Sequence, residues 1–163
     1  MINIRHATEN DLPAMLAIYN DIILNTMAVW HNYPHTLEMR QEWFALKKEQ
    51  GYPVFVAEEE GKLVGFSTIG PFRPWPGYRF TVENSIYVDS STRGKGIGKL
   101  LMPPLIDAAR ELGIHAIVAG IEASNEASIL LHKKFDFIEV AHFKEVGFKF
   151  NKWMDLKFLE LIL

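Results

Sequence analysis

Cysteine is absent from this chain of 163 residues, which excludes disulfide bonds, thiolate nucleophiles and cysteine-ligated zinc. Long apolar runs are missing as well. No window approaches the roughly 18 apolar residues of a membrane-spanning helix, so no membrane partner is expected. The first residues, MINIRHATENDLP, lack the apolar core of a signal peptide. By elimination, these absences favour a cytoplasmic protein.

An excess of basic residues is also lacking. Lys and Arg number 17 against 20 Asp and Glu, which gives a net charge of −3. A broad basic surface for nucleic acid is therefore not expected. The length predicts a single domain over residues 1–163, and the hydrophobic content of 48% is ordinary for a globular chain. The densest cationic cluster lies at residues 93–99, which suits a small anionic ligand.

The stretch from Ser85 to Met102, SIYVDSSTRGKGIGKLLM, predicts a strand, a glycine-rich loop and the start of a helix. In the loop, three glycines alternate with mostly basic residues: Arg93, Gly94, Lys95, Gly96, Ile97, Gly98 and Lys99. Without Cβ atoms the backbone is open to a ligand, and free N–H groups of the first helical turn point toward it. The helix dipole adds attraction for phosphate. The alternative is a turn that only caps the helix.

Two common phosphate-binding motifs do not fit this loop. A Walker motif requires Ser or Thr where Leu100 stands and glycine where Arg93 stands. The dinucleotide fingerprint requires glycine at position 99, which is Lys. The remaining pattern, Arg-x-x-Gly-x-Gly after a strand, resembles the pyrophosphate loop of the GNAT superfamily of acetyltransferases. This resemblance implies acetyl-CoA (coenzyme A) as the cofactor.

The order of predicted elements resembles the same fold over nearly the whole chain. Strands are expected near residues 3–7, 53–58, 62–69, 80–88, 115–121, 137–141 and 152–161, and helices near 11–24, 36–51, 96–112 and 124–134. This order implies an α/β fold with a mixed, mostly antiparallel sheet flanked by helices. The resemblance also implies that the strands carrying Val88 and Ala119 splay apart around the pantetheine arm. Ile86, Tyr87 and Val88 are the expected contacts on the first of these strands.

A polar stripe precedes the glycine-rich loop. Strand periodicity places five polar side chains on one face: Arg79, Thr81, Glu83, Ser85 and Tyr87. Glu83 is the only carboxylate among them, about 17 Å upstream of the loop in an extended strand. An amine with a pKa of roughly 8 or higher is largely protonated at neutral pH, so acetyl transfer to it benefits from a base. Glu83 is the predicted base, acting directly or through a water. The alternative is a solvated face on which Glu83 pairs with Arg79 or Arg73.

Further segments resemble the phosphinothricin and methionine sulfoximine acetyltransferases within that superfamily. They are the run 79–88, Ala17-Ile18-Tyr19-Asn20, Gly51-Tyr52-Pro53 and Lys149-Phe150-x-x-Trp153-x-Asp155-Leu156. The likeness implies a small amino acid substrate with a tetrahedral sulfur or phosphorus, and Glu83 as its base. It also implies a substrate-binding segment: Arg73, Pro74, Trp75, Tyr78, Arg79 and Thr81. An arginine there suits a carboxylate, which guanidinium binds through two parallel hydrogen bonds. Alternatively, Arg73 and Trp75 only stack on the surface.

Three residues of the short helix after residue 121 complete the expected site. The resemblance implies that Asn125 contacts the pantetheine amides, that Ser128 is a further cofactor contact, and that His132 is a proton donor or thiol partner. The alternative for His132 is a partly exposed helix face. One departure from the family is Asp136, which stands where the family has a glycine; aspartate adopts the left-handed conformation at modest cost.

Other interpretations are weaker or remain open. His31-x-x-x-His35 contains Pro34 and lacks an adjacent Glu, so no metal site is expected. An acetyltransferase for protein N-termini or polyamines would predict an open or acidic groove. A non-catalytic acyl-CoA-binding module would bind the coenzyme without turnover. Exposed aromatic residues, Trp30, Tyr33 and Trp75, favour a homodimer, as the resemblance also does.

Overall fold

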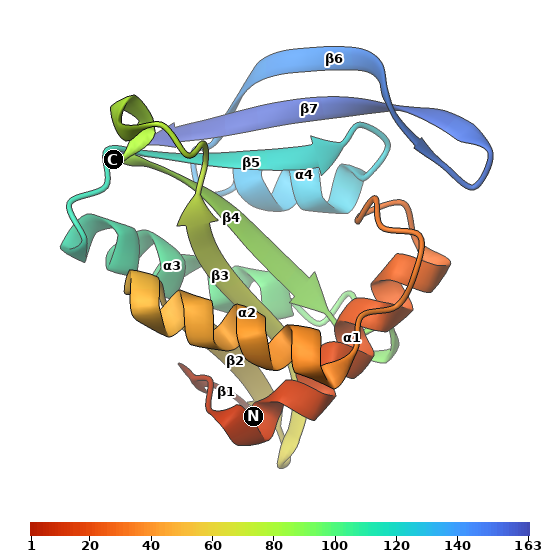
Figure 1. Cartoon of the computed structure of the whole chain (residues 1–163), viewed down its shortest axis with the longest axis vertical. Helices are drawn as coiled ribbons and strands as arrows, with labels where there is room; N and C mark the ends of the chain where they lie inside the picture. The colour runs from red at the N-terminus through yellow and green to blue at the C-terminus, as the bar shows by residue number, and fades with distance from the viewer.

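The computed structural model describes residues 1–163, in which helices cover both faces of a seven-stranded sheet (Figure 1). The strands are β1 (Ile2–His6), β2 (Val54–Glu59), β3 (Lys62–Pro71), β4 (Thr81–Val88), β5 (Ala116–Glu122), β6 (Ile138–Lys149) and β7 (Lys152–Ile162). The helices are α1 (Leu12–Asn25), α2 (Leu37–Gln50), α3 (Ile97–Glu111) and α4 (Glu126–Lys133). The sheet order is β1-β2-β3-β4-β5-β7-β6, and only the β4–β5 pair is parallel. The predicted order of elements and the mixed, mostly antiparallel sheet are confirmed.

The helix boundaries follow from capping residues that the sequence displays. Thr36 accepts a hydrogen bond from the Met39 N–H at the start of α2, and Gly51, with φ +76°, ends that helix. Asn125 accepts from the Ser128 N–H at the start of α4. After α4, Asp136 has φ +67°, so it adopts the left-handed conformation expected where the family has glycine. No helix combines the length and the apolar character needed to cross a membrane.

Two hydrophobic clusters occupy opposite faces of the sheet. The alternation of side chains along β4 separates them: Tyr87 packs with the α1–α2 cluster, whereas Ile86 and Val88 pack with the α3 cluster. Figure 1 shows α1 and α2 on the near face of the sheet and α3 and α4 on the far face. The residues of β4 therefore face two different environments in turn.

The strands β4 and β5 pair only at their starts. Thr81–Glu83 are in register with Ala116–Val118, and no pairs follow although both strands continue. The predicted splaying of these two strands is thus present. Polar backbone groups beyond Glu83 face a gap between the strands, and a ligand in that gap can bond to them.

The β6–β7 hairpin differs from the prediction. A strand was expected to end near residue 141, but β6 continues to Lys149 and passes two register shifts, between Glu139 and Ala141 and between Phe143 and Gly147. These irregularities break the alternation of side chains from which strand length is read. Phe150 and Asn151, with φ values of +51° and +56°, form the tight turn into β7. The hairpin extends beyond the body of the molecule (Figure 1).

Candidate functional site

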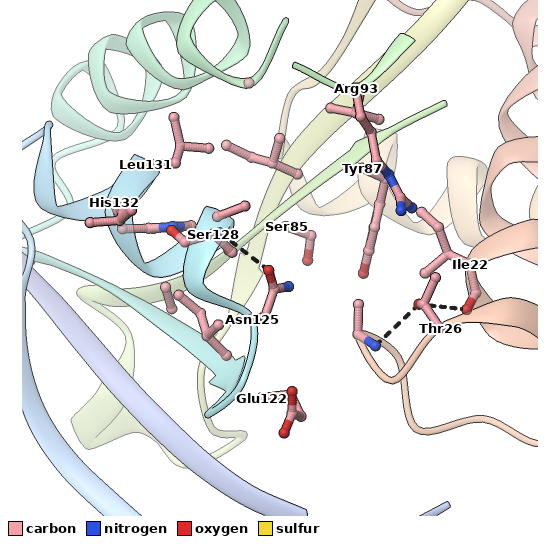
Figure 2. A pocket seen from close by; sticks show the side chains of 18 of the residues that line it. Ile22, Thr26, Ser85, Tyr87, Arg93, Glu122, Asn125, Ser128, Leu131 and His132 are labelled. Carbon is pink, nitrogen blue, oxygen red and sulfur yellow. Dashed lines mark hydrogen bonds between the residues drawn. The ribbon is translucent and has the colours of Figure 1, made fainter. Parts of the chain in front are cut away.

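A cavity of about 850 Å³ opens where β4 and β5 diverge. Its lining comes from β4, β5, the glycine-rich loop, the first turn of α3, α4, and the end of α1 with the loop that follows it. Figure 2 shows Asn125, Ser128, Leu131 and His132 of the α4 segment across the cavity from Tyr87 and Arg93, with Ile22 and Thr26 beyond Tyr87. The cavity is therefore continuous from the glycine-rich loop to the point where β4 and β5 separate.

The glycine-rich loop has the backbone shape that its sequence predicts. Gly94 and Gly96 have φ values of +82° and +78°, a region that favours glycine. Before them, Asp89 accepts hydrogen bonds from the N–H and the hydroxyl of Ser91, and these bonds hold the pKa of the Asp89 carboxyl below its ordinary value. Gly96 precedes α3 without a side-chain cap, and the Lys99 N–H donates to the Gly96 carbonyl, so the N–H groups of Ile97 and Gly98 stay free for a ligand.

Close packing explains the third glycine. A Cβ atom on Gly98 would lie 2.8 Å from Cδ2 of Leu131, so α3 and α4 approach each other there only because the side chain is absent. Of the loop cations, Arg93 and Lys99 line the cavity, whereas Lys95 forms an ion pair with Glu59 at 3.2 Å and lies outside the lining. Lys134 also lines the cavity, and the neighbouring Lys99 lowers the pKa of its ammonium. This cation was not predicted.

Glu83 lies in the cavity where the β4–β5 pairing ends. Burial raises the pKa of the Glu83 carboxyl above its ordinary value, while the Arg73 guanidinium and the backbone N–H of Gly120 oppose the shift. Oε1 of Glu83 is 3.0 Å from the position that a Cβ atom on Gly120 would take, so this glycine makes room for the carboxylate. The sequence offered no signal for Gly120, because strand pairing decides which residue lies opposite Glu83.

His132 is buried, and both of its ring nitrogens have partners inside the protein. Nδ1 lies 2.7 Å from the Ser128 carbonyl, which only accepts, so Nδ1 carries the proton. Nε2 then accepts from the amide nitrogen of Asn84 at 3.0 Å. Burial also lowers the pKa of His132. The alternative of a partly exposed helix face is wrong, and the neutral ring has no free N–H to donate.

Glu83 and His132 reach the cavity from opposite faces of the sheet. Glu83 shares its face with Tyr87, which contacts Tyr19 of α1 at a ring distance of 5.3 Å. The next residue, Asn84, points the other way, toward Met102 of α3 and His132 of α4. Two ligands can therefore meet in the gap between β4 and β5, one approaching from each face.

The predicted substrate-binding segment does not line the cavity. None of Arg73, Pro74, Trp75, Tyr78, Arg79 and Thr81 belongs to the lining. The Arg73 guanidinium lies 4.4 Å from the ring centre of Phe72, Arg79 donates to the Pro76 carbonyl, and Trp75 is 63% exposed. Stacking on the surface, the alternative given for Arg73, describes this loop better, although the Arg73 charge still acts on Glu83.

A second wall of the cavity was missed from the sequence. It is formed by Ile22 of α1 and by four residues of the following loop, Thr26, Met27, Ala28 and Val29. Thr26 stabilises the turn, since its hydroxyl donates to the Ile22 carbonyl at 2.8 Å and accepts from the Ala28 N–H at 3.2 Å (Figure 2). The segment carries no sequence motif that would predict its place in the cavity wall.

The profile of the acetyltransferase (GNAT) family matches residues 15–137. An L-methionine sulfoximine/L-methionine sulfone acetyltransferase of Pseudomonas paraeruginosa is 46% identical over 162 residues, covering 99% of this chain and 94% of that protein. A phosphinothricin N-acetyltransferase of Streptomyces coelicolor is 35% identical, covering 98% and 95%.

Solved structures of acetyltransferases share the fold of this chain. An acetyltransferase from Salmonella typhimurium with its cofactor acetyl-CoA has a TM-score of 0.97 and 42% identity, covering 99% of this chain and 94% of that one. A ribosomal-protein-alanine N-acetyltransferase from Brucella melitensis has a TM-score of 0.97 and 51% identity, covering 99% of each chain.

Proposed function

This chain belongs to the acetyltransferase (GNAT) family, and we propose that it transfers the acetyl group of acetyl-CoA to the α-amino group of a small amino acid analogue. The proposed acceptors are methionine sulfoximine, methionine sulfone and phosphinothricin, the substrates named in two relatives that match nearly the full chain. One observation carries the proposal: a single cavity joins the glycine-rich loop to the half-buried Glu83 carboxylate.

The glycine-rich loop fits the diphosphate of acetyl-CoA. Its left-handed glycines open the backbone, the first turn of α3 is uncapped, and Arg93 and Lys99 add positive charge. When bound, acetyl-CoA supplies an acetyl carbon that accepts the lone pair of an amine as the carbon–sulfur bond breaks. The proposed contacts are Ile86, Tyr87, Val88, Arg93, Gly94, Gly96, Ile97, Gly98, Lys99, Asn125 and Ser128, with Lys95 contributing its charge from outside the lining.

Glu83 is the proposed base. The acceptor amine arrives protonated, and a carboxylate at the point where the strands separate removes that proton, directly or through one water. Because burial raises the pKa of Glu83, the carboxylate is a stronger base than an exposed one. The backbone N–H of Val88, beyond the last β4–β5 pair, is the proposed donor to the oxygen that develops negative charge, whereas the N–H of Tyr87 points toward β3. The proposed role of His132 is that of a neutral side chain beside the departing thiol.

Residues 73–81 do not line the cavity, so they can bind the acceptor only if this loop moves or if Arg73 attracts the acceptor through its charge at a distance. Arg73 already acts on the charge of Glu83, so we assign it to the α-carboxylate of the acceptor. The exposed Trp75 and Tyr78 would close over the acceptor from the rim.

We also propose that the chain forms a homodimer in the cytoplasm. The β6–β7 hairpin presents apolar side chains that are about half exposed or more, including Phe143, Phe148, Phe150 and Trp153, and a patch of this kind marks an interface. Trp30, expected to be exposed, is instead half-buried against the hairpin. Sedimentation equilibrium tests the proposal, and a monomeric mass at micromolar concentration would count against it.

A second candidate is acetylation of a protein N-terminus, because the Brucella melitensis structure at 51% identity bears that activity in its name. A thiol-release assay separates the candidates when the purified chain is given each amine in turn with acetyl-CoA. The amino acid analogues should react at least tenfold faster than an Ala-initiated peptide or a polyamine. The reverse order would replace the first candidate, and coenzyme binding without thiol release from any amine would indicate a non-catalytic module.

A further inference from the structure

Lys149 is a buried cation that lies outside the lining of the cavity. It stands at the far end of β6 and is only 3% exposed. Its Nζ donates to three backbone carbonyls, those of Ile23 at 2.6 Å, Thr26 at 2.7 Å and Val29 at 2.6 Å. An ammonium has three N–H donors, so its hydrogen-bonding capacity is fully used without any carboxylate.

Two of the three carbonyls, those of Thr26 and Val29, belong to the second wall of the cavity, and the third precedes it in α1. Ile23 lies in the last turn of α1, where carbonyl groups lack partners within the helix and carry the negative end of its dipole. Thr26 and Val29 line the cavity, on the side of the sheet toward which Glu83 points. The ammonium thus joins the end of a helix to the loop that follows it.

Gly147 gives the same segment a second contact from the hairpin. A Cβ atom on this glycine would lie 2.5 Å from the indole ring of Trp30, so the ring rests directly on the β6 backbone. The hairpin therefore contacts residues 23–30 at two points on one strand, once by hydrogen bonds and once by packing. Within residues 26–30 the side-chain hydrogen bonds are those of the Thr26 turn and one from Trp30 to the Met27 carbonyl, and Val29 packs against the α1–α2 cluster.

We propose that Lys149 is a positioning residue for the acceptor: it fixes the wall formed by residues 26–29 and thereby sets where the amine sits relative to Glu83. The inference rests on the proposed function in one respect, namely that the acceptor enters on the Glu83 side of the sheet. It gives the Lys149-Phe150-x-x-Trp153 pattern a role in the reaction although the pattern lies outside the catalytic cavity.

The test compares Lys149→Met with Lys152→Met. Methionine keeps most of the apolar stem of lysine but has no ammonium group, so it leaves three carbonyls without their donor. Lys152 is exposed and is the cross-strand partner of Lys149 on the same hairpin, so its substitution removes an equal charge without touching the wall. In Lys149→Met, the acceptor KM should rise about tenfold or more while the acetyl-CoA KM stays within about twofold. Lys152→Met should match the wild type.

Hydrogen exchange supplies a readout that needs no acceptor. Amides of residues 22–30 should exchange faster in Lys149→Met, with those of β3 and α3 unchanged. Unchanged exchange in residues 22–30, or an equal change in both KM values, would overturn the proposal. Should Lys149→Met fail to fold, Gly147→Ala perturbs the same segment through Trp30 and must shift exchange and acceptor KM in the same sense. A wild type inactive on the amino acid analogues would reject the proposed substrates but leave the exchange result interpretable.

Discussion

Replacing Glu83 by Gln tests the proposed base most directly. The substitution keeps the size of the side chain beside Gly120 and removes its ability to take a proton. A positioned general base contributes about 10²- to 10⁴-fold to the rate, equivalent to about 3 to 5 kcal/mol of barrier. We therefore expect kcat/KM for the acceptor to fall by about that factor at neutral pH.

The pH profile sharpens this prediction. With Glu83 present, kcat/KM should rise as the carboxyl loses its proton, through a pKa raised above the ordinary 4.5, and then level off. Without the base, only the neutral amine reacts, so kcat/KM of Glu83→Gln should keep rising toward the pKa of the amine, at roughly 8 or higher. The difference between the two proteins should narrow in alkaline solution.

Folding stability separates a lost base from a damaged fold. Because the folded-state pKa of Glu83 is raised, its stabilising effect is complete below pH 4.5 and is lost as the pH rises through the folded value. At neutral pH the buried carboxylate therefore costs stability that a neutral amide does not. Glu83→Gln should unfold at an equal or higher denaturant concentration than the wild type near neutral pH.

The assay is thiol release under saturating acetyl-CoA, with Glu122→Gln as the matched carboxylate variant. Glu122 lines the same cavity, but its carboxylate accepts hydrogen bonds from the N–H and the hydroxyl of Ser124. These bonds stabilise the turn after β5. Glu83→Gln with full activity across neutral pH would refute the assignment. So would a larger loss in Glu122→Gln, which would move the base to β5.

Three further predictions concern the loop, a helix end and His132. Gly96→Ala should lose about 1 to 2 kcal/mol of folding stability, because alanine is strained at φ +78°. Its affinity for the coenzyme, measured by calorimetry, should also fall. An unchanged affinity would mean that the diphosphate binds elsewhere. Asp136→Gly should raise stability in urea by about 0.5 kcal/mol, since glycine adopts φ +67° without strain, whereas a loss would mean that the aspartate makes a contact that matters. The pKa of His132 is lowered by burial, so its contribution to stability should be present above pH 6.5 and lost as the pH falls through the folded value. His132→Gln should therefore lose less stability than the wild type as the pH falls below 6.5. His35, whose pKa is also lowered by burial, and carboxyls with lowered pKa values such as Asp89 should account for the acid sensitivity that remains.

Local patterns predicted the elements of the fold because their physical causes are local. Thr36 marks the start of α2 and Gly51 marks its end, through hydrogen bonds and backbone angles that depend on a few neighbouring residues. The exception is β6, whose register shifts are set by its pairing with β7, and strand pairing cannot be read from β6 alone. The same distinction applies to the site.

The sequence by itself determined the glycine-rich loop, the polar stripe carrying Glu83 and the order of strands and helices, since each follows from spacing along the chain. Only the tertiary structure decided that Gly120 makes room for Glu83, that both nitrogens of His132 are engaged, and that Lys149 binds carbonyls more than a hundred positions away in the chain. These contacts join segments with no local relation. They form when the strands pair and the hairpin packs on α1, because buried polar groups then have to find partners.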